Sequence, residues 1–146
     1  FSAEDHADLT DGTTESTIAM TATGREPIAV GATVSRNQYT ALSRVTTTKP
    51  WTLGRRYPLS ALGPTSDGRI KPDITAPGAA VVSSYNSFAA PRTVKADDVI
   101  YRREAGGKPY YWYVESGTSM ATPAVSGILA LWLQAPPSRP TGCANC

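Results

Sequence analysis

The stretch Ser119–Gln134, SMATPAVSGILALWLQ, decides the fold expected for this chain. Apolar side chains occupy almost every face of the helix that it predicts, and small residues fill its first half. A helix that is apolar all round is typical of a buried position, and small residues allow neighbouring backbones to approach closely. Pro123 lies early in the helix, where a missing amide hydrogen costs little. We therefore expect a buried central helix that begins at Ser119.

The residues that lead into this helix carry the chemistry expected of the chain. Glu115–Pro123 reads ESGTSMATP, so a tight approach through Gly117 and Thr118 precedes Ser119. The free amide hydrogens of a first helical turn, together with the helix dipole, stabilise negative charge that develops beside a serine placed there. The plain structural alternative is that Ser119 or Thr118 caps the helix, as these residue types often do. Taken alone, the local pattern favours the capping role.

Short extended segments separated by turns precede the helix. Pro27–Val34, PIAVGATV, has the continuous apolar pattern of a strand buried on both faces of a parallel sheet. Asn37–Pro58 predicts a surface excursion with a hairpin. Further strands are expected at Asp73–Ala76, Val81–Ser84, Asp97–Arg103 and Pro109–Val114, the last two forming a hairpin across Glu104–Lys108. The pattern predicts an α/β fold in which mainly parallel strands pack on the buried helix.

Composition excludes several functional classes. The 146 residues have a net charge of +2 and no basic cluster, so a nucleic-acid partner is not expected. The longest fully apolar run, Ile128–Leu133, is far shorter than the roughly 20 residues of a membrane span. No carboxylates have the spacing of a calcium loop, so we expect neither a metal nor another cofactor.

Both ends of the chain are expected to differ from its centre. Residues 1–17 predict a loop, and residues 135–146 predict an atypical tail. Cys143 and Cys146 form a CxxC pattern in this tail, but they lack the context of a zinc or redox site. The chain begins without an initiator Met or a signal peptide, which we expect of a piece of a longer protein.

The string Gly117–Pro123, GTSMATP, resembles the nucleophile motif of the subtilisin-like serine proteases, the subtilases. Three upstream segments resemble the same family in the same order, namely PIAVGAT at Pro27–Thr33, SALGPTSDGRIKPD at Ser60–Asp73 and KPDITAPG at Lys71–Gly78. The resemblance covers about Ile18–Gln134. It implies that residues 1–146 form a single partial domain, the C-terminal part of a subtilase catalytic domain with a partial subtilisin-like fold.

The resemblance also implies roles for the residues around the motif. Ser119 would be the nucleophile of an acyl transfer in which a histidine takes its proton and an aspartate orients the histidine. The Ser119 amide would supply half of the oxyanion hole, with the Thr118 hydroxyl beside it. Met120 would line the pocket, and Gly117 would let the substrate backbone pass closely. A peptide or protein substrate is implied, as is a secreted or cell-envelope location.

The chain departs from the family at the other catalytic positions. Its single histidine, His6, lies in EDHAD without the Gly-Thr that follows the family's histidine. The motifs for the catalytic aspartate and for the oxyanion-hole asparagine are also missing. Asp73 belongs to a strand segment, where we expect it to pair or hydrogen-bond rather than to orient a histidine.

These departures define the expected partner and activity. The partner is the missing N-terminal half of the catalytic domain, and its absence should leave an open core. A serine without a base is a poor nucleophile, so the isolated chain should have negligible peptidase activity. Use of His6 as a substitute base is one alternative. Another is a non-catalytic, subtilase-like remnant that binds a peptide or a partner.

Overall fold

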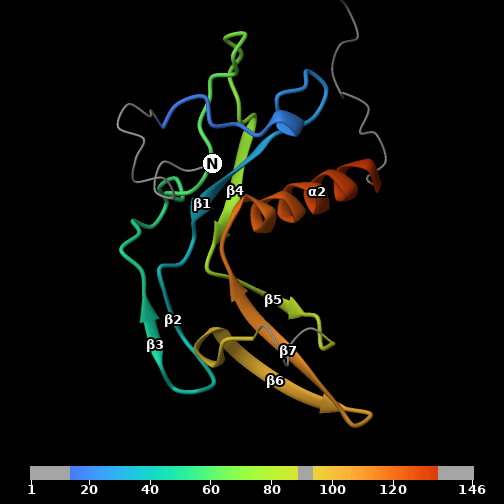
Figure 1. Cartoon of the computed structure of the whole chain (residues 1–146). Coiled ribbons are helices and arrows are strands. Elements are labelled where there is room, and N and C mark those ends of the chain that lie inside the picture. Colours follow the sequence, from blue (N-terminus) through green and yellow to red (C-terminus); the bar gives the residue numbers. More distant parts are fainter. Residues whose placement is uncertain (1–13, 89–93, 135–146) are drawn as a thin grey trace, which may run out of the picture.

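The computed structural model describes residues 14–88 and 94–134. Its strands are β1 Val30–Val34, β2 Gln38–Thr40, β3 Thr46–Thr48, β4 Ile74–Ala79, β5 Val81–Tyr85, β6 Val99–Ala105 and β7 Lys108–Glu115. Two short 3-10 turns, η2 Met20–Ala22 and η3 Ala96–Asp98, and the helix α2 Thr118–Gln134 complete the elements. Figure 1 shows three small groups of strands, with α2 placed beside β1 and β4.

The pair β1 and β4 is parallel and supports the start of α2. Ala32 lies opposite Ala76 in this pair, and the register shifts between Thr33 and Val34. The other groups are antiparallel: β2 pairs with β3, and β5, β7 and β6 form a sheet in that order. The α/β character is therefore present, but the expected predominance of parallel strands is not found in the described part of the chain. Antiparallel pairs need only a short turn, whereas each parallel pair needs a long crossover.

The expected hairpins are confirmed. The turn between β6 and β7 consists of Gly106 and Gly107, whose φ angles are 58° and 72°. Two successive positive φ angles define the turn type that matches the twist of a two-residue hairpin, and glycine adopts them without steric strain. The excursion expected within residues 37–58 contains the second hairpin, β2 and β3.

A tyrosine pair joins the first hairpin to the second. The Tyr39 hydroxyl on β2 donates to one carboxylate oxygen of Asp98 at 2.5 Å, and the Tyr113 hydroxyl on β7 donates to the other at 3.3 Å. Burial, reinforced by the hydrogen bond to Asp98, raises the pKa of Tyr39 to about 12. The two tyrosines therefore stay protonated at neutral pH and hold the hairpins together.

The core lies between β1, β4 and the first half of α2. Apart from Tyr57, it is built from small side chains, which are Ala32, Val34, Ala76, Ala79, Ala121 and Val125. Gly78 marks the closest approach, because a Cβ atom there would lie 2.5 Å from the Ala32 Cβ and 3.2 Å from the Ala121 Cβ. The small residues of the helix thus bring its backbone close to the parallel pair.

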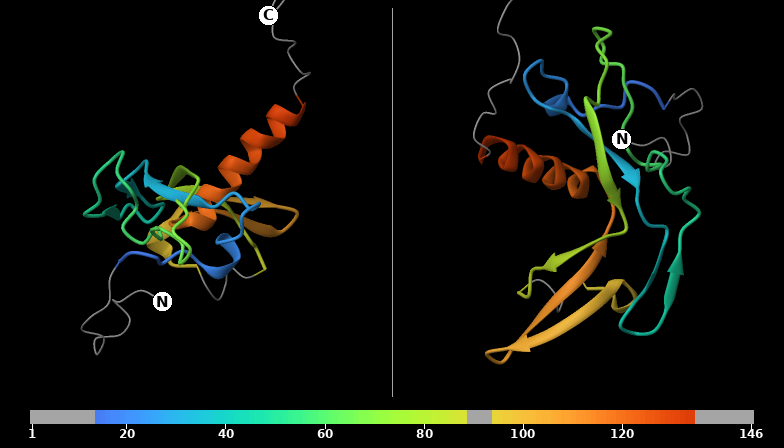
Figure 2. Two further views of the ribbon diagram at one scale, coloured as in Figure 1. Left: turned by 90° about the horizontal axis from the view of Figure 1, so that it is seen from above. Right: turned by 180° about the vertical axis from the view of Figure 1, so that it is seen from behind.

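The second half of α2 is exposed. Ala121 and Val125 are buried, and Leu129 is half-buried against the core. The other four large apolar residues nearer the C-terminal end are 50–88% exposed, namely Ile128, Leu131, Trp132 and Leu133. Figure 2, seen from above, shows the helix extending away from the strands. The expectation of a helix buried on all sides is therefore wrong for this structure, because no described strand lies under its second half. The helix begins at Thr118, one residue earlier than expected.

Candidate active site

The turn that precedes α2 is fixed to the end of β4 by hydrogen bonds. The Gly117 amide donates to the Gly78 carbonyl at 2.7 Å, and the Ala80 amide donates to the Ser116 hydroxyl at 2.9 Å. Gly117 has a φ of 155°, a backbone conformation that residues with a side chain rarely adopt. The backbone around Gly117 is thus held by β4, and this sets the position of the residues that follow.

Ser119 is exposed and is the second residue of α2. Helical geometry leaves the Ser119 amide without a partner inside the helix, and the helix dipole adds partial positive charge at the same point. Because the helix begins at Thr118, the cap position belongs to Gly117, and the Met120 amide donates to the Gly117 carbonyl at 3.1 Å. Neither the Ser119 nor the Thr118 hydroxyl makes a hydrogen bond within residues 14–88 and 94–134. The capping alternative therefore has no geometric support.

Pro123 affects the same serine through the backbone. It lies in the second turn of α2 rather than the first, so its amide nitrogen stands where a helical residue would donate to the Ser119 carbonyl. The expectation that its missing hydrogen costs little was based on a first-turn position and is wrong. The ring leaves the Ser119 carbonyl without this intrahelical donor.

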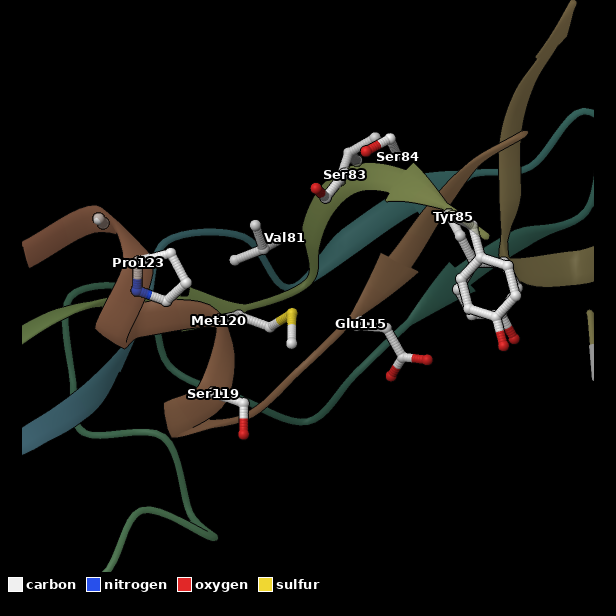
Figure 3. A pocket seen from close by; sticks show the side chains of 11 residues that line it. Val81, Ser83, Ser84, Tyr85, Glu115, Ser119, Met120 and Pro123 are labelled. Atoms are coloured by element: carbon white, nitrogen blue, oxygen red, sulfur yellow. The ribbon is translucent and has the colours of Figure 1, made fainter. Parts of the chain in front are cut away.

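Ser119 opens into a cavity of about 600 Å³ between α2 and β5. Figure 3 shows the Ser119 hydroxyl projecting from the start of the helix, with Met120 beside it and Glu115 at the end of β7. The remaining lining residues are Val81, Val82, Ser83, Ser84, Tyr85, Tyr113, Pro123 and Ala124. The cavity therefore combines an exposed hydroxyl with an apolar wall and a single carboxylate.

The other residues singled out in the sequence lie elsewhere. Thr118 lines a second, smaller cavity of about 90 Å³, together with Gly31 and Ser60. Gly117 lines neither of these two cavities, and its amide instead bonds the turn to Gly78. The structure thus brings Ser119 and Met120 to one cavity and directs Thr118 to another.

Residues 14–88 and 94–134 contain no histidine. His6 is the single histidine of the chain and lies outside the described residues, as do Cys143 and Cys146. The loop expected at residues 1–17 is described only from residue 14, and the tail at 135–146 is not described. Within residues 14–88 and 94–134, no three His, Cys, Asp or Glu side chains are grouped so as to hold a metal ion. The same residues contain no helix that is long and apolar enough to cross a membrane.

Asp73 has the structural role expected of it. Its carboxylate accepts hydrogen bonds from the Lys71 ammonium and from the Ala29 amide, both at 2.7 Å. The Lys71 side chain is only 5% exposed and also donates to the Pro27 carbonyl at 2.8 Å. The Lys71 hydrogen bond, followed by that of Ala29, lowers the pKa of Asp73. This carboxylate therefore links the segment before β1 to the segment before β4, through its hydrogen bonds with Ala29 and Lys71.

Three supporting residues were not found by sequence reasoning. Ser60 is 3% exposed, and its hydroxyl accepts a hydrogen bond from the Ala32 amide at 2.9 Å. The Ser116 hydroxyl accepts a hydrogen bond from the Ala80 amide, and Glu115 lines the cavity in front of Ser119. For Glu115 the available signal was its place four residues before Ser119. The partners of Ser60 and Ser116 are distant in sequence and left no local pattern.

Comparison with known proteins identifies relatives of this chain. An uncharacterized protein of Aquifex aeolicus is 34% identical over 134 residues, which cover 92% of this chain and 53% of that protein. The serine protease AprX of Bacillus subtilis is 42% identical over 80 residues, covering 53% of this chain and 16% of AprX. A subtilisin-like protease of Arabidopsis thaliana, SBT4.10, is 36% identical over 61 residues, which cover 42% of this chain and 8% of that protease. No solved structure gives a significant match.

The chain spans about half the length of the Aquifex relative and far less of the two proteases. A sequence model of the subtilase family matches residues 4–142, nearly the whole chain. The match includes the serine turn, the strand pair beneath it and the cavity in front of it. The chain therefore belongs to the subtilase family.

Proposed function

We propose that this chain carries the nucleophile of a subtilisin-like serine endopeptidase and that Ser119 is that nucleophile. One observation carries the proposal: the Ser119 hydroxyl is exposed at the first turn of a helix and faces a cavity large enough for a peptide segment. Membership in the subtilase family supports a serine peptidase in general. The substrate is accordingly a peptide or a protein.

The proposed reaction is an acyl transfer in two steps. The Ser119 oxygen attacks the carbonyl carbon of the scissile bond while a base takes the hydroxyl proton, and the C–N bond then breaks as the amine leaves with that proton. Water hydrolyses the resulting ester by the reverse proton transfers. The Ser119 amide, free inside the helix, would donate to the oxyanion, a contribution that is typically about 3 kcal/mol in such sites. Met120 would bound the site beside the nucleophile, and Gly117 would allow the substrate backbone to pass.

The base and its aspartate are proposed to come from an upstream segment of the catalytic domain. The exposed part of α2 supports this partner. Ile128 and Trp132 continue the same helical stripe as the buried Ala121 and Val125, yet they are 50% and 71% exposed. A core-facing stripe that runs beyond its strands needs a further covering layer. By family membership we also propose secretion or attachment to the cell envelope.

Labelling with a fluorophosphonate tests the nucleophile. The full chain should show negligible labelling by intact mass, and labelling should develop when a polypeptide with the family's aspartate and histidine motifs is added. Ser119→Ala should abolish that signal. Ser126→Ala is the matched control, since Ser126 lies on the same helix and donates to the Thr122 carbonyl at 3.1 Å. No labelling of the reconstituted complex, or labelling that survives Ser119→Ala, would refute the proposal.

The same experiment separates two alternatives. A non-catalytic remnant that binds a peptide or a partner is favoured by the lack of any histidine in the described residues. In that case the complex forms but Ser119 remains unlabelled. If the isolated chain is labelled instead, His6→Ala decides whether His6 is the base: an unchanged rate removes it from the mechanism.

A further inference from the structure

The hairpin of β6 and β7 has one face that is covered at its base and open toward its turn. At the base, Val114 belongs to a buried cluster with Tyr39 and Ala80. Side chains alternate along a strand, so Trp112 and Tyr110 lie on the same face of β7 as Val114. Figure 1 shows the hairpin projecting away from β1, β4 and α2. Tyr110 is 43% exposed, so the outer part of this face is open to solvent in the described structure.

Aromatic rings gather on the open part of the face. Tyr101 of β6 lies opposite Trp112 in the register, and the centres of their rings are 5.1 Å apart. Tyr101 is 52% exposed, and Trp112 is half-buried. Tyrosine and tryptophan combine an apolar body with a polar edge, and they are enriched where a membrane meets water. These rings therefore form an exposed surface of intermediate polarity.

Two basic side chains border the rings. Arg103 lies opposite Tyr110 in the register and two residues after Tyr101, which places it on the same face. Lys108 lies two residues before Tyr110, and its ammonium is 4.8 Å from the centre of the Phe88 ring. Phe88 is 77% exposed and adds another ring at the margin of the face. Neither Arg103 nor Lys108 forms an ion pair within the described part of the chain.

The carboxylates of the hairpin lie on its opposite face. Glu104 pairs with Arg102, which lies opposite Tyr111 in the register with its guanidinium 5.9 Å from the centre of that ring. By the same alternation, Tyr111 and Glu115 lie on the other face of β7, where Glu115 lines the cavity in front of Ser119. The open face therefore carries two positive charges and no carboxylate of the hairpin.

We propose that this face docks on the surface of an anionic phospholipid membrane, with its rings at the level of the headgroups and its cations against the lipid phosphates. The docking face consists of Phe88, Tyr101, Arg103, Lys108, Tyr110 and Trp112. Such binding adds the burial of apolar area to the attraction between basic side chains and anionic lipids. A nucleic acid fits the face less well, because its affinity depends on the neutralisation of many phosphates and this face has two cations. Because the Ser119 cavity lies over the other face, docking would leave it open.

Co-sedimentation of the full chain with lipid vesicles tests the proposal. Vesicles of phosphatidylcholine with about 30% phosphatidylglycerol should bind the chain about twentyfold more tightly than vesicles of phosphatidylcholine alone, as for two basic residues near an anionic surface. Salt at about 1 M should remove most of this difference, because the screening length is then about 3 Å. Arg103→Gln should weaken binding to the anionic vesicles about fivefold, and Phe88→Ala about tenfold.

Two matched variants show whether the effect belongs to the docking face. Arg102→Gln removes the same charge one residue away, but from the opposite face, and should change binding by less than about twofold. Leu133 is 88% exposed near the end of α2, and Leu133→Ser should likewise leave binding unchanged. All these side chains are exposed, so each variant should keep the circular dichroism spectrum of the parent chain.

Tryptophan fluorescence locates the contact. The chain has three tryptophans, and only Trp112 lies on the docking face. Vesicles with brominated acyl chains quench a tryptophan that they approach. Trp112→Phe keeps an aromatic ring, so this variant should still bind but lose most of the quenching. Quenching that survives Trp112→Phe would place another surface of the chain against the membrane.

The remaining outcomes decide the inference. Equal binding to both kinds of vesicle, or equal losses for Arg102→Gln and Arg103→Gln, would overturn it. Binding of a single-stranded oligonucleotide without binding of vesicles would also overturn it and assign the face to nucleic acid. Ser119→Ala should bind vesicles as the parent chain does, so the labelling experiment and the vesicle experiment can each fail without affecting the other.

Discussion

The Gly117 amide donates a hydrogen bond to the Gly78 carbonyl at 2.7 Å, so the turn that carries Ser119 is bonded directly to strand β4. The backbones at Gly78 and Gly117 approach each other closely. A Cβ atom on Gly78 would lie only 2.7 Å from the Gly117 carbonyl oxygen. Glycine is therefore needed at position 78 for close approach and at position 117 for its backbone angle. The position of Ser119 depends on this pair.

Gly78→Ala should destabilise the chain and disturb the serine turn. The added methyl group would meet buried Ala32 and backbone atoms that cannot move independently, so we expect a loss of about 2–3 kcal/mol in the free energy of unfolding. Urea denaturation measures the loss. Gly127→Ala is the control on α2, where a Cβ would meet nothing within 4 Å and should stabilise by about 0.5–1 kcal/mol. Equal effects of the two substitutions would contradict the close packing.

Ser60→Ala tests a buried hydrogen bond under β1. The Ala32 amide is fully buried and donates to the Ser60 hydroxyl, so removal of that oxygen leaves the amide without an acceptor. We expect the free energy of unfolding to fall by about 1–3 kcal/mol. The nearby Ser66 is exposed, and Ser66→Ala should change the free energy of unfolding by less than about 0.5 kcal/mol. A Ser60→Ala variant as stable as Ser66→Ala would show that the amide finds another acceptor.

Acid should destabilise the fold through two paired carboxylates. The hydrogen bonds from Arg69 and Thr65 lower the pKa of Asp67 to about 2, and the Lys71 hydrogen bond lowers that of Asp73. A lowered folded-state pKa adds stability that is present above the unfolded pKa and is lost as pH falls through the folded value. Urea midpoints should therefore fall between about pH 5 and pH 2.

Replacement of both carboxylates should flatten this dependence. The double variant Asp67→Asn, Asp73→Asn should be less stable at neutral pH and lose less on acidification. Glu26→Gln changes an exposed carboxylate that makes no ion pair in the described structure and should leave the slope intact. An unchanged slope in the double variant would assign the acid sensitivity to other groups.

Features controlled by neighbouring residues were predictable from sequence. The hairpin across Gly106 and Gly107 depends on local turn chemistry, and the β1 segment depends on its own apolar run. The role of Asp73 in a strand segment was also predictable, because its partner Lys71 lies two residues away. The serine turn was found because a short motif specifies both its backbone and its chemistry.

Features that depend on distant segments were not predictable. The apolar pattern of α2 predicts burial, but its second half has no covering layer in the described chain, so the same pattern gives an exposed surface. The Ser60 hydrogen bond to Ala32 spans 28 residues, and the Ser116 hydrogen bond to Ala80 spans 36. No local periodicity encodes such contacts. Glu115 does have a local signal, its place four residues before Ser119, but its position beside β5 depends on the antiparallel pairing of β5 with the end of β7.

The exposed stripe of α2 provides the test of the missing partner. Ile128→Glu places a charge on a side chain that is 50% exposed, so the stability of the isolated chain should change by less than about 0.5 kcal/mol. Association with the upstream polypeptide should weaken strongly, because an unpaired carboxylate would be buried in that interface. Sedimentation and the yield of Ser119 labelling after mixing measure this effect.

Two variants define the limits of this result. Val125→Ala alters the buried part of the same stripe and should destabilise the isolated chain by about 1–2 kcal/mol, since it removes apolar volume from the core. Gln134→Lys adds a charge at the exposed end of the helix and should affect neither stability nor association. If Ile128→Glu leaves association intact, the stripe is not the surface that the upstream half covers, and the exposed half of α2 must be explained by another partner.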